Sequence, residues 1–228
     1  MERASGILMH LSSLPSPYGI GTLGAEARQF VDFLALSGQR YWQMLPIGPT
    51  RYGDSPYQSF STFAGNPYFI DLELLCEDGL LTRAECEAPF WGSDPLRVDY
   101  AALYHARFPL LKKAFERGWD RDAQDVAAFE ARNGDWLPDY ALYMAIKSHF
   151  DMVSWTQWPD EAIRLRRPEA LEKYTQMLGR RIRFWIYIQY LFDKQWRALH
   201  SYASEKGVSL IVELPIYVAL DSADAWAN

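Results

Sequence analysis

Four side chains stand out in this sequence because their types and neighbours suit chemistry. His10 and Glu213 each follow a short apolar run, whereas Tyr52 and Tyr57 lie among glycines and prolines, where a role in the core is less natural. A carboxylate beside an apolar run needs a partner or a polar site, because an unpaired buried charge is costly. Glu213 could therefore pair with an arginine or cap a turn, and His10 could donate to a loop carbonyl.

The aromatic content adds a second indication. Aromatic residues make up 15 % of the 228 residues, with 9 Trp, 14 Tyr and 12 Phe. A large aromatic core accounts for most of them. The sharper interpretation is sugar binding, in which the apolar C–H face of a sugar lies flat on an aromatic ring and nearby polar groups meet its hydroxyls. Composition alone does not choose between the two.

Several classes of function are excluded or disfavoured by the residues. The formal net charge of −6, with no basic block, disfavours nucleic-acid binding. Cys76 and Cys86 fit no zinc motif, and the four histidines lie far apart, so no metal site is expected. No stretch reaches the roughly 18 apolar residues of a membrane span. We expect a cytoplasmic protein with free thiols. Phosphate-binding and nucleophile-elbow motifs do not occur.

The elements that must position these residues begin as β-α-β. Apolar runs predict buried strands at residues 6–10 and 41–45, and helical spacing predicts a helix over 24–37 that Gly38 ends. This order implies parallel strands. Residues 48–67 form a long loop of the kind that is usually functional. Residues 69–72 are read as a short strand.

The rest of the chain is mainly helical until a third strand. Helices are expected at 103–117, 122–132 and 138–150, followed by a long helix over 179–206. A third buried strand is expected at 208–212, continuing into 216–219. The fold class is therefore α/β, the first three or so strands of a TIM (β/α)8 barrel with a large helical insertion. The expected domains are 1–72, 73–178 and 179–228, with the barrel incomplete at 228.

In a barrel, the active site lies at the carboxyl ends of the strands. Retaining glycoside chemistry would need two carboxyl groups about 5–5.5 Å apart there. After the third strand the sequence offers Glu213, Asp221 and Asp224, but no later strand to carry a partner. The unpaired sheet edges of a three-stranded piece predict a covering partner or self-association.

Three regions resemble the 4-α-glucanotransferases, also called amylomaltases or disproportionating enzymes. The resemblance is strong over residues 5–82 and 184–228 and weaker through the helical middle. It is carried by 5–8 with 13–21, by 41–46 followed by Tyr52-Gly53-Asp54-Ser55-Pro56-Tyr57-Gln58-Ser59 and Ala64-Gly65-Asn66-Pro67, and by Leu214-Pro215-Ile216-Tyr217-Val218-Ala219 with 221–224 and Trp226.

The resemblance implies an α-amylase-like TIM barrel and a disproportionation reaction. An α-1,4-glucan is cleaved, its donor part is held covalently, and the 4-hydroxyl of an acceptor sugar takes it up. Tyr57 would be the platform under the reacting sugar, Asp54 and Ser55 would shape that pocket, and Tyr52 would contact the glucan elsewhere or on the acceptor side. The partners are α-1,4-glucans and maltooligosaccharides, with no metal or organic cofactor.

The resemblance also places the catalytic residues. The family's nucleophile, acid/base and stabilising carboxylates match positions beyond Asn228, so none of them is expected within this chain. Where the family usually has Gly-Asp before Leu-Pro-Ile, with the aspartate in the sugar pocket, this chain has Val212-Glu213. Two alternatives stay open: a non-catalytic glucan-binding or interaction module derived from the family, and a hydrolase of the same lineage.

Overall fold

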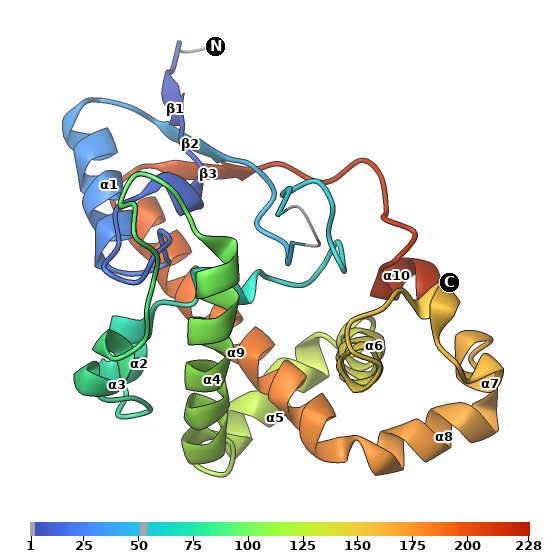
Figure 1. The fold of residues 1–228 in the computed structure, drawn as a ribbon. Helices are drawn as coiled ribbons and strands as arrows, with labels where there is room; N and C mark the ends of the chain where they lie inside the picture. Colours follow the sequence, from blue (N-terminus) through green and yellow to red (C-terminus); the bar gives the residue numbers. More distant parts are fainter. Residues whose placement is uncertain (1–2, 51–53) are drawn as a thin grey trace. The chain divides into compact units, whose positions relative to one another are not determined.

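The computed structural model describes residues 3–50 and 54–228 (Figure 1). They divide into two compact units. The first comprises the described residues of Met1–Ile47 with Gly65–Gly118 and Leu191–Leu214, and the second comprises those of Gly48–Ala64 with Trp119–Tyr190 and Pro215–Asn228. Each unit is described by itself below.

The secondary structure is helical apart from three short strands. The strands are β1 (Gly6–Leu8), β2 (Tyr41–Met44) and β3 (Ser209–Val212). The α-helices are α1 (Ala25–Leu36), α2 (Leu72–Glu77), α3 (Arg83–Glu87), α4 (Tyr100–Gly118), α5 (Ala123–Arg132), α6 (Leu137–His149), α7 (Glu161–Arg164), α8 (Pro168–Met177), α9 (Gly179–Glu205) and α10 (Ala223–Ala227). Short 3₁₀ helices cover Leu11–Ser13, Pro67–Phe69 and Trp155–Gln157.

The strands form one parallel sheet in the order β1-β2-β3, as the sequence predicts (Figure 1). Trp42 pairs with Ile7 on one side and with Leu210 on the other. Beyond the ladder, Met9 N–H donates to the Gln43 carbonyl at 3.0 Å, and Glu213 N–H donates to the Met44 carbonyl at 3.1 Å. The register therefore continues into the residues that follow β1 and β3.

Helix α1 and strand β2 supply the core next to the sheet. Ala27, Val31 and Leu34 recur at helical spacing and are buried, and Trp42 is fully buried. The Trp42 ring meets Phe30 edge-to-face at 4.8 Å between ring centres. Its indole N–H donates to the Met9 carbonyl at 2.7 Å, so a large apolar side chain is buried with its one donor satisfied.

Asp71 joins three segments of the first unit. Its carboxylate accepts from the Thr22 hydroxyl at 2.6 Å and from the Leu74 backbone N–H at 2.9 Å, which caps α2. The Gln195 side chain of α9 accepts from the Asp71 N–H at 2.7 Å and donates to its carbonyl at 3.1 Å. These bonds satisfy the backbone of a buried residue at a helix entrance.

The second unit has an aromatic core. The rings of Tyr143, Trp158 and Trp226 lie 5.6–5.9 Å apart between centres, and all three are buried. The Trp226 indole N–H donates to the Ile163 carbonyl at 3.1 Å. The Arg166 guanidinium lies 4.3 Å from the centre of the Trp226 ring. These aromatic residues therefore serve packing, which is the first of the two interpretations of the composition.

The strand expected at residues 69–72 is wrong. Residues 67–69 form a 3₁₀ helix, whose start is capped by the Asn66 side chain accepting from Tyr68 N–H at 3.0 Å. Helix α2 then begins at Leu72, after its cap Asp71. The Asn66 and Asp71 side chains accept hydrogen bonds from backbone N–H groups of this segment. These bonds replace the ones that a strand would make within a sheet.

The strands are also less buried than their apolar runs predicted. Leu8 is 55 % exposed and Ile211 is 44 % exposed. Strand β3 ends at Val212 rather than resuming at 216–219, where Ile216 and Tyr217 are 89 % and 84 % exposed. Pro215 lacks the backbone N–H that a ladder needs, so a strand does not continue through it. Within the described residues, no helix combines the length and apolar character needed to cross a membrane.

We predict that Gly6→Ala destabilises the first unit. A Cβ at Gly6 would lie 2.4 Å from the Tyr41 carbonyl oxygen, so β1 and β2 would have to separate. The expected loss in the free energy of unfolding is about 1–3 kcal/mol. Gly179→Ala is the matched control, because a Cβ there meets no atom within 4 Å. Urea unfolding measures both, and an equal midpoint for Gly6→Ala and the unsubstituted chain would contradict the prediction.

Candidate functional site

One group of candidate residues lies at the carboxyl end of the sheet in the first unit. His10 follows β1 directly before the 3₁₀ helix Leu11–Ser13, and Glu213 follows β3. Because the carboxyl ends of parallel strands meet at one edge, both side chains belong to the same edge. The Glu213 carboxylate accepts from the Gln43 amide of β2 at 3.1 Å. All three strands thus contribute to this edge.

His10 is held as a half-buried imidazole. Its ring meets Phe69 edge-to-face at 5.5 Å between ring centres. Among the described residues, its buried Nδ1 has no hydrogen-bond partner, so this nitrogen does not donate to a loop carbonyl there. Burial lowers the pKa of His10 below its usual 6.5, while the charge of Glu213 opposes that shift. The lowered pKa favours the neutral form of the ring at neutral pH.

Two contributors to this edge were missed in the sequence. Gln43 holds the carboxylate of Glu213, and Phe69 packs against the ring of His10. Gln43 carried a signal, since it is an amide within an otherwise apolar strand, on the strand next to the one that ends at Glu213. Phe69 carried none, because the turn that brings it to His10 depends on the caps at Asn66 and Asp71.

A separate group of candidate residues lies in the loop of the second unit. Tyr57 is 51 % exposed, so its ring is accessible as the sequence predicts. Ser55 begins a turn in which its carbonyl accepts from Gln58 N–H at 3.1 Å. Asp54 adopts a left-handed backbone with φ of 53°, and burial raises the pKa of its carboxyl group against a lowering contribution from the Thr50 hydroxyl. Tyr52 lies outside the described residues.

The loop is tied to the segment that forms α10. The Asp224 carboxylate accepts from the Thr62 N–H at 2.7 Å, the Thr62 hydroxyl at 3.0 Å and the Ser61 hydroxyl at 3.2 Å. The Ala223 N–H donates to the Phe60 carbonyl at 2.8 Å. One carboxylate thus satisfies three donors of a segment with no regular secondary structure, which fixes its backbone.

Asp221 is committed to the interior of the second unit. It accepts from the Lys147 ammonium at 2.8 Å, the Tyr143 hydroxyl at 2.7 Å and the Trp155 backbone N–H at 3.2 Å. Burial raises the pKa of Asp221, but the bonds from Lys147 and Tyr143 outweigh it, and the net shift is downward. Asp221 and Asp224 therefore serve structure, and of the three carboxylates after β3 only Glu213 follows the strand directly.

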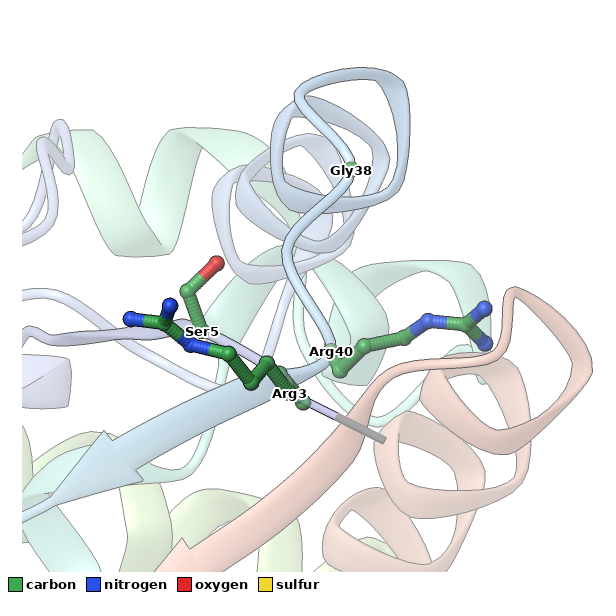
Figure 2. A pocket seen from close by; sticks show the side chains of 5 residues that line it. Arg3, Ser5, Gly38 and Arg40 are labelled. Carbon is green, nitrogen blue, oxygen red and sulfur yellow. The ribbon is translucent and has the colours of Figure 1, made fainter. Parts of the chain in front are cut away.

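The opposite edge of the sheet carries a hollow of about 330 Å³. It is lined by Arg3, Ala4, Ser5, Gly38 and Arg40, which precede β1 and β2 (Figure 2). Figure 2 shows the two guanidinium groups pointing away from each other, so they do not converge on one anion. The described residues also contain no group of three His, Cys, Asp or Glu side chains placed to hold a metal ion.

We predict that Glu213→Gln lowers the pKa of His10 further. The carboxylate favours the imidazolium form, and the amide does not. Because the folded pKa lies below 6.5, the unfolded chain binds this proton more readily. His10 therefore reduces the free energy of unfolding as the pH falls below about 6.5. NMR titration of the histidine rings, with His10→Gln for assignment, measures the shift. An unchanged or higher pKa in Glu213→Gln would contradict the role given to Glu213.

We predict that Asp224→Ala loosens the loop. Hydrogen exchange at the Thr62 amide should accelerate about 10- to 100-fold, because a charge-assisted bond to that N–H is lost. Asp224→Asn keeps one acceptor oxygen and should give a smaller increase. Asp135→Ala, at an exposed position of the same unit, is the control. Equal exchange rates in Asp224→Ala and the control would show that other contacts hold the loop.

Comparison with known proteins gives a consistent result. A family model described as 4-alpha-glucanotransferase matches residues 9–228. The 4-alpha-glucanotransferase of Streptococcus pneumoniae is 50 % identical over 228 residues, and that of Thermus thermophilus is 47 % identical over 232. Both alignments cover 100 % of this chain but 45 % of the relative. The chain thus spans less than half the length of these relatives.

Solved structures agree. The amylomaltase of Streptococcus agalactiae, in complex with acarbose, matches with a TM-score of 0.96 and 44 % identity over 99 % of this chain and 46 % of its own. The amylomaltase of Corynebacterium glutamicum, at 20 % identity, has a TM-score of 0.68 over 98 % of this chain and 32 % of its own, which shows a similar fold. With a family model matched from residue 9 to residue 228, the chain belongs to the 4-alpha-glucanotransferase family.

Proposed function

We propose that this chain supplies the N-terminal part of a 4-α-glucanotransferase and contributes its glucan-binding surface. The observation that carries the proposal is Tyr57, whose ring is 51 % exposed in a loop that Asp224 holds by three hydrogen bonds. An exposed ring in a loop that is anchored at Ser61 and Thr62 presents a flat apolar face, and the anchored segment loses little backbone freedom on binding. That is the form of surface on which a sugar ring stacks.

The other candidate residues supply polar contacts. In this proposal Asp54 and Ser55 shape the pocket beside Tyr57, and Tyr52 contacts the glucan further along or on the acceptor side. His10 and Glu213 meet sugar hydroxyls at the carboxyl end of the sheet, where Gln43 holds the Glu213 carboxylate. The similarity to an amylomaltase whose structure contains acarbose supports a carbohydrate ligand for this surface.

The chemical step is proposed to need carboxylates from outside these 228 residues. Transfer with retention breaks the glycosidic bond with help from an acid, holds the donor on a nucleophilic carboxylate, and passes it to a sugar 4-hydroxyl. Asp221 and Asp224 are engaged in structural bonds, so neither is proposed as a catalytic carboxylate beside Glu213. The chain's own residues would bind and orient the glucan.

The proposal extends to architecture and location. The three parallel strands are taken as the first strands of a TIM barrel, with residues 73–178 as a helical insertion between the second and third. The exposed apolar side chains on β1 and β3 support a further covering element or a second copy of the chain at the sheet. Two unpaired thiols support a cytoplasmic location.

Binding of maltotriose to the chain tests the proposal. We expect NMR shifts at Tyr57 and its neighbours to saturate with added maltotriose. Tyr57→Ala should raise Kd by about 5- to 150-fold, because loss of one stacking partner is worth about 1–3 kcal/mol. Tyr57→Phe keeps the ring and should bind nearly as well. Tyr104→Ala, at an exposed tyrosine of α4, is the control for loss of any surface ring.

The same samples give the catalytic result. Purified chain incubated with maltotriose should release no glucose and form no longer maltooligosaccharides, since the proposal assigns the nucleophile and the acid/base to residues outside these 228. Turnover that disappears in Glu213→Gln would place a catalytic carboxylate inside the chain and overturn this division of roles. Absence of saturable binding, or equal binding by Tyr57→Ala and Tyr104→Ala, would remove the glucan platform.

A further inference from the structure

The two cysteines of the chain lie against each other in the first unit. Cys76 is near the end of α2 and Cys86 is in α3, and their sulfur atoms are 3.6 Å apart. The chain has no other cysteine. Both are thiols, with Cys76 half-buried and Cys86 fully buried. This contact lies outside the candidate glucan site and is independent of the proposed function.

We propose that Cys76 and Cys86 form an oxidisable dithiol, a modification site at which a peroxide converts the pair to an internal disulfide. Two features carry it. The sulfurs are in contact, so bond formation at about 2.05 Å needs a shift of roughly 1.5 Å. The connection through residues 78–82 turns at Gly79, with φ of 72°, and a side chain there would meet no atom within 4 Å. The turn therefore has room to adjust.

The exposure of the two thiols sets the order of events. Cys76 is the accessible sulfur, so its thiolate attacks one oxygen of hydrogen peroxide, the O–O bond breaks, and a sulfenic acid and hydroxide result. The Cys86 sulfur then attacks the sulfenic sulfur. The S–S bond forms, the S–O bond breaks, and the hydroxide leaves with the Cys86 proton as water. Overall, two thiols and one peroxide give one disulfide and two waters.

The surroundings make the first step slow and the second efficient. Burial raises the pKa of Cys76, with Glu73 adding to the rise while the Cys86 thiol and Arg83 oppose it. Burial raises the pKa of Cys86 to about 12. The thiol form of Cys76 dominates at neutral pH, so the pair reacts with sustained rather than brief exposure to peroxide. Once Cys76 is oxidised, the neighbouring sulfur is already in place.

The helix that holds Cys86 is fixed at both ends. Thr82 caps α3 in a reciprocal arrangement with Glu85, and Arg117 of α4 bonds the Glu85 carboxylate through two nitrogens at 2.8 Å. After the helix, the Trp91 indole N–H donates to the Cys86 carbonyl at 2.9 Å. Cys86 therefore stays beside Cys76 in the reduced protein, and the cross-link joins segments that are already neighbours.

Mass spectrometry of the intact 228-residue chain tests this. After hydrogen peroxide treatment and alkylation of remaining thiols in denaturant, we expect a monomer that has lost two hydrogens, with the peptides of Cys76 and Cys86 linked. Dithiothreitol should restore both thiols. In Cys86→Ser, Cys76 should stop at a sulfenic acid that dimedone captures, and further oxidation of Cys76 should be roughly tenfold or more faster than in the unsubstituted chain.

A measurement on the unsubstituted chain keeps the proposal testable if a cysteine variant fails to fold. Brief treatment of the folded, reduced chain with iodoacetamide should alkylate Cys76 and leave Cys86 as a thiol. Cys76→Ser should leave Cys86 unreacted toward peroxide. Three results would overturn the proposal: a sulfinic acid on Cys76 beside an unreacted Cys86 thiol, a disulfide between two chains in place of the internal one, or no loss of thiol under peroxide that oxidises free cysteine.

Discussion

The central strand β2 is the constraint on which the strand-end part of the structure depends. It pairs on both sides, so the position of each outer strand is measured from it. The Trp42 indole N–H of β2 donates to the carbonyl of Met9, which directly precedes His10. The Gln43 amide of β2 donates to the carboxylate of Glu213. Met44 then receives the Glu213 N–H. Parallel neighbours cannot be joined by short turns. Helix α1 connects β1 to β2, and the long segment after Met44 connects β2 to β3.

Three carboxylates close together in the sequence show how environment assigns roles. Asp221 is paired with Lys147 in the interior, Asp224 satisfies the backbone and hydroxyls of residues 61 and 62, and Glu213 stands at the end of β3 with an amide partner. Their side chains are chemically almost equivalent. Asp221 neutralises a buried ammonium, and Asp224 accepts from loop donors that would otherwise lack a bond. Glu213 remains at the end of the strand.

Much of the fold is readable in the sequence because the strongest signals are local. The β-α-β start, the long helix α9 and the third strand each combine apolar periodicity with a stop signal such as Gly38 or Gly207, both of which adopt positive φ. The strand predicted at residues 69–72 did not form, because capping by Asn66 and Asp71 outweighed a short apolar run that Asp71 itself interrupts. Among the candidate site residues, His10 and Glu213 could be located from the predicted strand ends. The Asp224 contacts join residues more than 160 positions apart, so no local sequence pattern indicates them.

Glu213 shows how a strand-end carboxylate is held by the neighbouring strand. The resemblance noted in the sequence expects aspartate at this position, and this chain has glutamate, which is one methylene longer. The Glu213 carboxylate accepts from the Gln43 amide at 3.1 Å, while the Glu213 backbone N–H donates to the Met44 carbonyl. A carboxylate has more acceptor positions than a single amide bond uses, which is why Glu213 suits the polar contact proposed for it. In the proposed glucan site, the role of Glu213 is that of a positioned acceptor, and strand β2 supplies through Gln43 the partner that positions it.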